Sequence, residues 1–207
     1  MDKNKKCVLV SGGAGYIGSH VTVELIEAGY DVVVADNLSN CDLTCFNGVK
    51  KITGKEDLPF EQIDCCDQKS VDMVFEKYRI DAVIHFAAFK AVGESVAEPI
   101  KYYKNNLMSF LCILDAAKNH GGCNVLFSSS ATVYGETDKL PVTEESPRQP
   151  AESSYGATKQ ICEDILTDVV RATGAYGTEV RSGVKELGPV KGIALRYFNP
   201  IGAHPSA

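Results

Sequence analysis

The most constraining feature of the sequence is a glycine-rich turn, GGAGYIG, which joins a short apolar run to a segment with helical periodicity. Gly12 permits a tight turn, Gly15 lets the backbone approach a pyrophosphate, and Gly18 allows the helix to pack closely. The amino terminus of that helix favours the negative charge of a phosphate group. A turn of this kind between a strand and a helix predicts a dinucleotide-binding site.

An acidic residue stands at the end of the second expected strand. Asp36 follows Gly18 by 18 residues, and its carboxylate is expected to accept hydrogen bonds from the adenosine ribose. The same charge would repel a 2′-phosphate, so the cofactor is expected to be NAD and not NADP. The alternative is that Asp36 is an ordinary turn residue of the Asp-Asn-Leu-Ser stretch.

Short apolar runs rich in β-branched residues alternate with segments of helical periodicity. The expected strands are Cys7–Val10, Asp31–Ala35, Leu58–Ile63, Ala82–Phe86, Asn124–Ser128 and Gly192–Tyr197. This alternation predicts an α/β fold, a doubly wound parallel sheet of the Rossmann type with helices on both faces. The stretches 37–54, 135–154 and 174–191 are expected to be loops, and the last is expected to be a mobile surface excursion.

Charge and cysteine spacing exclude several classes of partner. A formal net charge of -6 argues against nucleic acid or an anionic membrane as a partner and favours a small molecule. The eight cysteines show no CxxC pair and no metal-ligand spacing, so we expect structural thiols and no metal site. The first apolar run breaks at Ser11 and resembles neither a signal peptide nor a membrane span, so a cytoplasmic protein is expected.

A second group of residues predicts proton transfer. A run of serines ends with Ser130 at the close of the fifth expected strand, and Tyr155 and Lys159 follow at i, i+4 spacing at the start of a helix. Lys159 would share a helix face with Tyr155 and favour its phenolate, together with the positive nicotinamide ring of NAD+. Ser130 would hold the substrate hydroxyl against Tyr155. A Tyr-x-x-x-Lys pair alone could equally be an exposed helix pair.

Together these residues resemble the extended short-chain dehydrogenase/reductase family and, within it, the UDP-glucose 4-epimerase family. The resemblance is carried by GGAGYIGSH at 12–20, DNLSN at 36–40, HFAAFKAVGES at 85–95, SSSATVYG at 128–135, SYGATK at 154–159 and LRYFNPIGAHP at 195–205. It implies catalytic roles for Ser130, Tyr155 and Lys159, which would also contact the cofactor. The further cofactor contacts that it implies are Gly12, Gly15, Tyr16, Ile17, Gly18, Asp36, Asn37, Asp64, Cys65, Phe86, Ala87, Ala88, Lys90, Asn105 and Phe198.

The resemblance also implies a substrate and a reaction. Asn199, together with Ser130 and Tyr155, would contact UDP-galactose or UDP-glucose, which the family interconverts by a transient oxidation at the sugar C4. Family members are longer, so we expect residues 1–207 to be an NAD-binding domain with only the start of the substrate region, the substrate domain being absent. The possible homodimer would use the helix that contains Tyr102 and Tyr103.

Two alternatives stay open. One is another NAD-dependent sugar-nucleotide enzyme, a dehydratase or decarboxylase, which begins with the same oxidation at C4. Such enzymes need a further acid/base group beside the serine, and the Ser130-Ala131-Thr132 stretch has no Asp-Glu pair. The other is a catalytically silent NAD-binding protein, because a chain of this length could be truncated and inactive.

Overall fold

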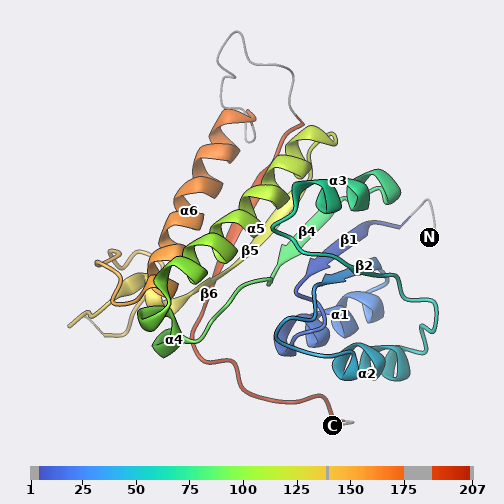
Figure 1. Cartoon of the computed structure of the whole chain (residues 1–207), viewed down its shortest axis with the longest axis horizontal. Coiled ribbons are helices and arrows are strands. Elements are labelled where there is room, and N and C mark those ends of the chain that lie inside the picture. Colours follow the sequence, from blue (N-terminus) through green and yellow to red (C-terminus); the bar gives the residue numbers. More distant parts are fainter. Residues whose placement is uncertain (1–4, 139, 175–187, 206–207) are drawn as a thin grey trace.

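The computed structural model describes residues 5–138, 140–174 and 188–205 of the 207-residue chain. Within these residues, six parallel strands form one sheet in the order β3-β2-β1-β4-β5-β6 (Figure 1). The strands are β1 (Cys7–Ser11), β2 (Asp31–Asp36), β3 (Phe60–Gln62), β4 (Ala82–His85), β5 (Asn124–Ser130) and β6 (Lys191–Tyr197). This order is that of a dinucleotide-binding doubly wound sheet, so the predicted fold class is confirmed. Residues 175–187 of the expected 174–191 excursion lie outside the described residues.

Helices cover both faces of the sheet, as Figure 1 shows. One face carries α1 (Tyr16–Glu27) and α2 (Thr44–Thr53), and the other carries α3 (Gln68–Lys77), α5 (Pro99–Asn119) and α6 (Ser154–Ala172). The short helix α4 (Val92–Ala97) precedes α5, and the 3-10 turn η1 (Ala131–Tyr134) follows β5. In the part of the chain that the structure describes, no helix has the length and apolar character needed to cross a membrane.

Local sequence explains where several helices begin. The Asp67 side chain accepts hydrogen bonds from two backbone N–H groups at the start of α3, and the Ser153 side chain accepts one, of 3.1 Å, at the start of α6. Side chains of these types satisfy the N–H groups that a helix start leaves unpaired. Pro99 opens α5, where its missing N–H costs nothing. By contrast, no side chain caps α1, which begins at the glycine-rich turn.

Strands β1 and β2 are buried along their whole length on both faces, which explains their nearly continuous apolar sequence. Leu9 and Val33 point to the side of α3 and α5, whereas Val8 and Val34 point to the side of α1 and α2. Each such side chain stabilises the fold by roughly 1.5–3 kcal/mol when it is fully buried. The buried sheet therefore holds the carboxyl ends of its strands in fixed positions.

One expected loop is wrong in part, because residues 37–54 contain α2. Phe46 and Val49 are buried, and Ile52, which packs against the same core, continues their helical spacing. Gly54 ends the helix in the left-handed conformation. Gly48 in the middle lowers the helix propensity and no side chain caps the start at Leu43, so the loop expectation missed a helix whose apolar face packs toward α1.

The eight cysteines all lie in described parts of the chain, and all are free thiols. Burial raises the pKa of Cys7 to about 11 and the pKa values of Cys65 and Cys123 to about 12. These thiols stay protonated near neutral pH and pack as small apolar side chains.

Candidate active site

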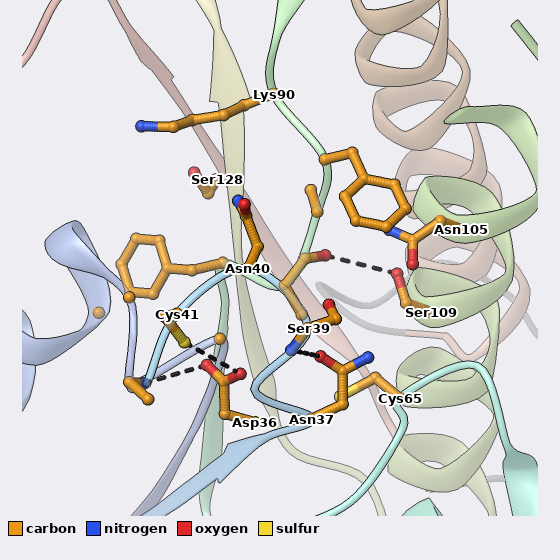
Figure 2. Close-up of a pocket in the computed structure, with 18 of the residues that line it drawn as sticks. Asp36, Asn37, Ser39, Asn40, Cys41, Cys65, Lys90, Asn105, Ser109 and Ser128 are labelled. Atoms are coloured by element: carbon orange, nitrogen blue, oxygen red, sulfur yellow. Dashed lines mark hydrogen bonds between the residues drawn. The ribbon is translucent and has the colours of Figure 1, made fainter. Parts of the chain in front are cut away.

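A cavity of about 310 Å³ opens at the carboxyl ends of β1 and β4, where the strand order changes direction. The loops that follow these two neighbouring strands run to opposite sides, and a crevice at such a point is the usual ligand site of an open α/β sheet. The glycine-rich turn lines one wall and residues 86–90 line another. Figure 2 shows the cavity, with Asp36 and Asn37 at one side and Lys90 and Ser128 at the other.

The glycines of the glycine-rich turn bring backbone atoms against the cavity wall. Gly12 has φ 74°, and a Cβ atom there would lie 2.6 Å from the backbone nitrogen of Ala87. A Cβ atom on Gly18 would collide with the carbonyl oxygen of Gly12 and lie 2.7 Å from the Cα of Gly13. Because α1 has no side-chain cap at Gly15, the N–H groups of its first turn are left for an anion.

Asp36 is buried at the end of β2 and lines the same cavity. Its Oδ2 accepts a hydrogen bond of 3.1 Å from the N–H of Ala14, and its Oδ1 accepts one of 2.9 Å from the N–H of Leu38. The Cys41 thiol donates a third, of 3.5 Å, as Figure 2 shows. Asp36 therefore does act as a turn residue, and the same bonds fix its carboxylate at the cavity wall.

Tyr155 and Lys159 lie on one face of α6, and both line the cavity. The Lys159 ammonium is buried, lies 5.7 Å from the centre of the Tyr155 ring, and donates a hydrogen bond of 2.7 Å to the carbonyl oxygen of Ser128. Burial lowers the pKa of Lys159 from 10.5 to about 8. Burial raises the pKa of the Tyr155 phenol above 10.0, and a hydrogen bond with Ser130 lowers it. The phenol thus needs a further positive charge to ionise near neutral pH.

Most of the predicted site residues line this cavity. Those that do so are Gly12, Gly15, Tyr16, Ile17, Gly18, Asp36, Asn37, Asp64, Cys65, Phe86, Ala87, Ala88, Lys90, Asn105, Tyr155 and Lys159. Ser130 is absent from the lining, but its side chain lowers the pKa of the Tyr155 phenol.

Phe198 and Asn199 lie outside the cavity lining, in the exposed segment after β6. The Phe198 side chain is 65% exposed. This segment crosses to α1, where the Tyr16 hydroxyl donates a hydrogen bond to the carbonyl of Gly202 and the His204 N–H donates one of 3.2 Å to His20. The predicted contacts of Phe198 with a nicotinamide and of Asn199 with a sugar are thus not visible in the geometry of this chain.

Sequence reasoning missed several residues of the cavity wall. They are Ala14, Ser39, Asn40, Cys41, Cys45, Ile63, Phe89, Ser109 and Ser128. The loop after β2 supplies three of them, Ser39, Asn40 and Cys41, and no periodic pattern marks such a loop. Ser128 contributes its backbone carbonyl to Lys159, a contact for which the residue type gives no signal. Beside Ser130, the Thr132 hydroxyl is buried without a hydrogen-bond partner among the described residues, which is the kind of group that a ligand can satisfy.

A parallel sheet in this order, a glycine turn against the cavity and a fixed carboxylate define a doubly wound α/β protein of the dinucleotide-binding type, with a tyrosine-lysine pair in the same cavity. Residues 9–191 match the family described as GDP-mannose 4,6 dehydratase, and the chain belongs to that family.

Individual relatives are more specific. The chain is 49% identical over 199 residues to a UDP-glucose 4-epimerase of Bacillus subtilis, covering 96% of this chain and 54% of that protein. It is 45% identical over 203 residues to UDP-glucose 4-epimerase 2 of Arabidopsis thaliana, covering 97% of this chain and 54% of that protein. The sequence-based resemblance to UDP-glucose 4-epimerases is confirmed, and the chain spans about half the length of the curated relatives it matches.

Solved structures agree. A UDP-glucose 4-epimerase from Bifidobacterium longum in complex with NAD+ and UDP superposes with a TM-score of 0.88 at 44% identity, covering 97% of this chain and 56% of that one. The enzyme from Stenotrophomonas maltophila with bound NAD and formylated UDP-arabinopyranose gives a TM-score of 0.84 at 40% identity, covering 97% of this chain and 55% of that one.

Proposed function

We propose that this chain is the NAD-binding half of an enzyme that interconverts UDP-galactose and UDP-glucose. The observation that carries the proposal is the placement of Tyr155 and Lys159 in the cavity that begins at the glycine-rich turn. One cavity therefore holds a phosphate cradle and an acid/base pair. Relatives of the chain are named UDP-glucose 4-epimerases, and one was solved with NAD+ and UDP, which supports the same function. In this proposal residues 1–207 form one NAD-binding domain that reaches only the start of the substrate region.

The residues of the cavity fit NAD. The glycine turn leaves room where a Cβ atom would collide, and the uncapped start of α1 would hold the pyrophosphate. Asp36 would accept hydrogen bonds from the adenosine ribose, with Asp64 and Cys65 beside the adenine. Bound NAD would supply the hydride acceptor and a positive ring.

The acid/base residues would carry the proton. The Tyr155 phenolate would take the proton from the sugar 4-hydroxyl while C4 gives its hydride to the dinucleotide. Once the 4-keto sugar has turned and hydride has returned to the opposite face of C4, the Tyr155 phenol would give the proton back to the oxygen. Ser130 bonds with the phenol and would hold the 4-hydroxyl against it. Lys159 brings a positive charge to within 5.7 Å of the ring centre, anchored by the carbonyl of Ser128. The sequence of steps inverts C4 with no net oxidation.

The experiment measures turnover of UDP-galactose by the purified, NAD-loaded chain, coupled to oxidation of the UDP-glucose formed, with UDP affinity measured on the same sample. Turnover that Tyr155→Phe reduces by about 10²–10⁴-fold, the range of general acid/base catalysis, supports the proposal. Full turnover by Tyr155→Phe would contradict the assignment of the base.

Two other functions have weaker support. A dehydratase or decarboxylase would need an acidic pair beside Ser130, and Ala131 and Thr132 stand there. A catalytically silent NAD-binding protein is the other alternative, and the intact Ser130, Tyr155 and Lys159 argue against it. NAD binding without turnover and without UDP affinity would decide for this last function.

Asp36 should set the choice between NAD and NADP. We expect Asp36→Asn to narrow the preference for NAD over NADP by at least tenfold, about 1.4 kcal/mol, because the repulsion of the 2′-phosphate is lost. Asp42→Asn is the control, since Asp42 is an exposed carboxylate that accepts a hydrogen bond from the nearby Thr44 N–H and does not line the cavity. Equilibrium dialysis with each dinucleotide measures the ratio, and a ratio equal to that of wild type in Asp36→Asn would exclude the role.

We propose further that the chain forms a homodimer through the outer faces of α5 and α6. Large apolar side chains are exposed there, among them Met108 and Leu111 on α5 and Ile161 on α6. Light scattering should show a dimer for the wild type and a monomer for Leu111→Lys. Leu195→Lys, which changes an exposed leucine on β6, should leave the dimer intact. A monomeric wild type, or a monomeric Leu195→Lys with a dimeric Leu111→Lys, would contradict the choice of surface.

The place of the protein in the cell also stays a prediction. We expect a cytoplasmic enzyme without a nucleic-acid partner, and the eight free thiols and the net charge of -6 support this. Fractionation of cells that express the chain would test it.

A further inference from the structure

We propose that Glu163 is a positioning residue that holds α6 in register with β5 at the acid/base centre. This inference rests on the proposed function, because Glu163 would act through Tyr155 and Lys159. Glu163 does not line the cavity, so it is not itself expected to touch a cofactor or substrate.

Glu163 is a buried carboxylate with an unusually full set of partners. Its side chain is 9% exposed. Oε1 accepts a hydrogen bond of 2.6 Å from the Ser129 hydroxyl and one of 2.9 Å from Arg196 Nε, and Oε2 accepts one of 2.7 Å from the same guanidinium. Arg148 adds an ion pair at 3.7 Å. A buried carboxylate is costly unless it is paired in this way, so the arrangement specifies one position for the residue.

The partners belong to different parts of the fold. Ser129 is on β5, Arg196 is on β6, and Arg148 is in the loop before α6. Arg196 also donates a hydrogen bond of 2.9 Å to the hydroxyl of Tyr134 in η1. Through one side chain, Glu163 thus connects α6 to two strands, to the loop before it and, by way of Arg196, to η1.

The contact with β5 lies among the contacts of the acid/base residues. Glu163 follows Lys159 by one helical turn and Tyr155 by two, so the three share a helix face. On the strand, Ser129 lies between Ser128, whose carbonyl binds Lys159, and Ser130, whose side chain lowers the pKa of Tyr155. A shift of α6 along β5 would disturb the bonds of Lys159 and Glu163 together and would move Tyr155 relative to Ser130. The Ser129–Glu163 bond therefore fixes the position along β5 at which the Tyr155 phenol and the Lys159 ammonium lie.

The experiment reads the ionisation of Tyr155 in the whole chain. Tyrosine labelled with 13C at Cζ is titrated by NMR, and Tyr155→Phe identifies the signal. Glu163→Gln keeps an oxygen for Ser129 but loses the paired charges. We expect the Tyr155 midpoint to rise by at least about half a pH unit, because a looser bond with Ser130 lowers the phenol pKa less. The other groups near the phenol, Lys159 and Tyr102, are unchanged in this variant.

Asp164→Asn is the matched control, because it removes the neighbouring carboxylate, which is exposed and pairs with Arg148 on the outer side of α6. It should leave the Tyr155 midpoint unchanged. NAD affinity should stay within about twofold of wild type in both variants, since neither residue lines the cavity. A folded Glu163→Gln with the wild-type midpoint would overturn the proposal.

A milder variant covers the case in which Glu163→Gln does not fold. Ser129→Ala removes one hydroxyl and leaves the pair of Glu163 with Arg196, and it should move the midpoint in the same direction by a smaller amount. An unmoved midpoint there would also overturn the proposal. Because the readout is a phenol pKa, a chain that binds NAD but shows neither turnover nor UDP affinity would count against the proposed function and leave the test of Glu163 intact.

Discussion

Gly18→Ala is expected to cost the chain about 3 kcal/mol of stability, near the upper end of overpacking effects, and to weaken NAD binding by at least tenfold. The added Cβ atom would collide with the carbonyl oxygen of Gly12 and lie 2.7 Å from Gly13 Cα. Both atoms belong to the backbone, so no side chain can move aside. Relief requires the glycine turn to move away from α1, and that movement spoils the cradle for the pyrophosphate. Chemical denaturation and calorimetric titration with NAD measure the two losses.

Gly48→Ala is the control for this substitution. Gly48 lies inside α2, and a Cβ atom there would meet no atom within 4 Å. It should stabilise the chain by roughly 0.5–1 kcal/mol, because alanine favours a helix over glycine. NAD affinity should not change. If Gly18→Ala bound NAD as wild type does, the turn would not be the phosphate site.

Lys159→Met is expected to stabilise the chain at pH 7 by about 2 kcal/mol and to remove the acid/base function. Burial holds the folded pKa of Lys159 at about 8, below its ordinary value of 10.5. The unfolded chain therefore binds the proton more tightly between these two pH values. The destabilisation is fully present below pH 8 and disappears as the pH rises from about 8 to 10.5. Loss of the bond to Ser128 offsets part of the gain.

The measurement is the difference in unfolding free energy between Lys159→Met and wild type across this pH range. This difference should shrink as the pH rises. Because both chains contain the same buried thiols, subtracting the two free energies cancels the contribution of thiol titration. Lys104→Met changes an exposed lysine on α5 and should alter stability by less than about 0.5 kcal/mol. A Lys159→Met chain less stable than wild type at pH 7 would show that the buried ammonium of Lys159 does not destabilise the folded wild-type chain. The expected result is a site that retains an unfavourable buried charge for function.

The glycine turn and the first strand could be predicted from the sequence because their causes are local. Gly12, Gly15 and Gly18 need no partner elsewhere to indicate a strand, a tight turn and a closely packed helix. Asp36 was predictable for the same reason, since its spacing follows from one β-α-β unit. α2 was missed although Phe46, Val49 and Ile52 carry helical spacing, because Gly48 and the uncapped start resemble a loop.

The side chains of the proposed acid/base site could be predicted from the sequence, but the groups that position them could not. Tyr155 and Lys159 are four residues apart on one helix, so the sequence pairs them. Lys159 binds a backbone carbonyl 31 residues away, and Glu163 binds partners 33 and 34 residues away. Only the folded sheet brings these groups together, and no sequence spacing encodes them. The predicted contact of Phe198 with a nicotinamide is a different case. It depends on the segment after β6, which is exposed and bonds to α1 in this structure.

The most direct test of the account is a calorimetric titration of the purified chain with NAD, after any bound dinucleotide has been removed. The account predicts one NAD per chain, weaker binding of NADP, and loss of binding in Gly18→Ala with Gly48→Ala unchanged. A folded wild-type chain that takes up no NAD, or that binds NADP as well as NAD, would contradict the assignment of the cavity between β1 and β4.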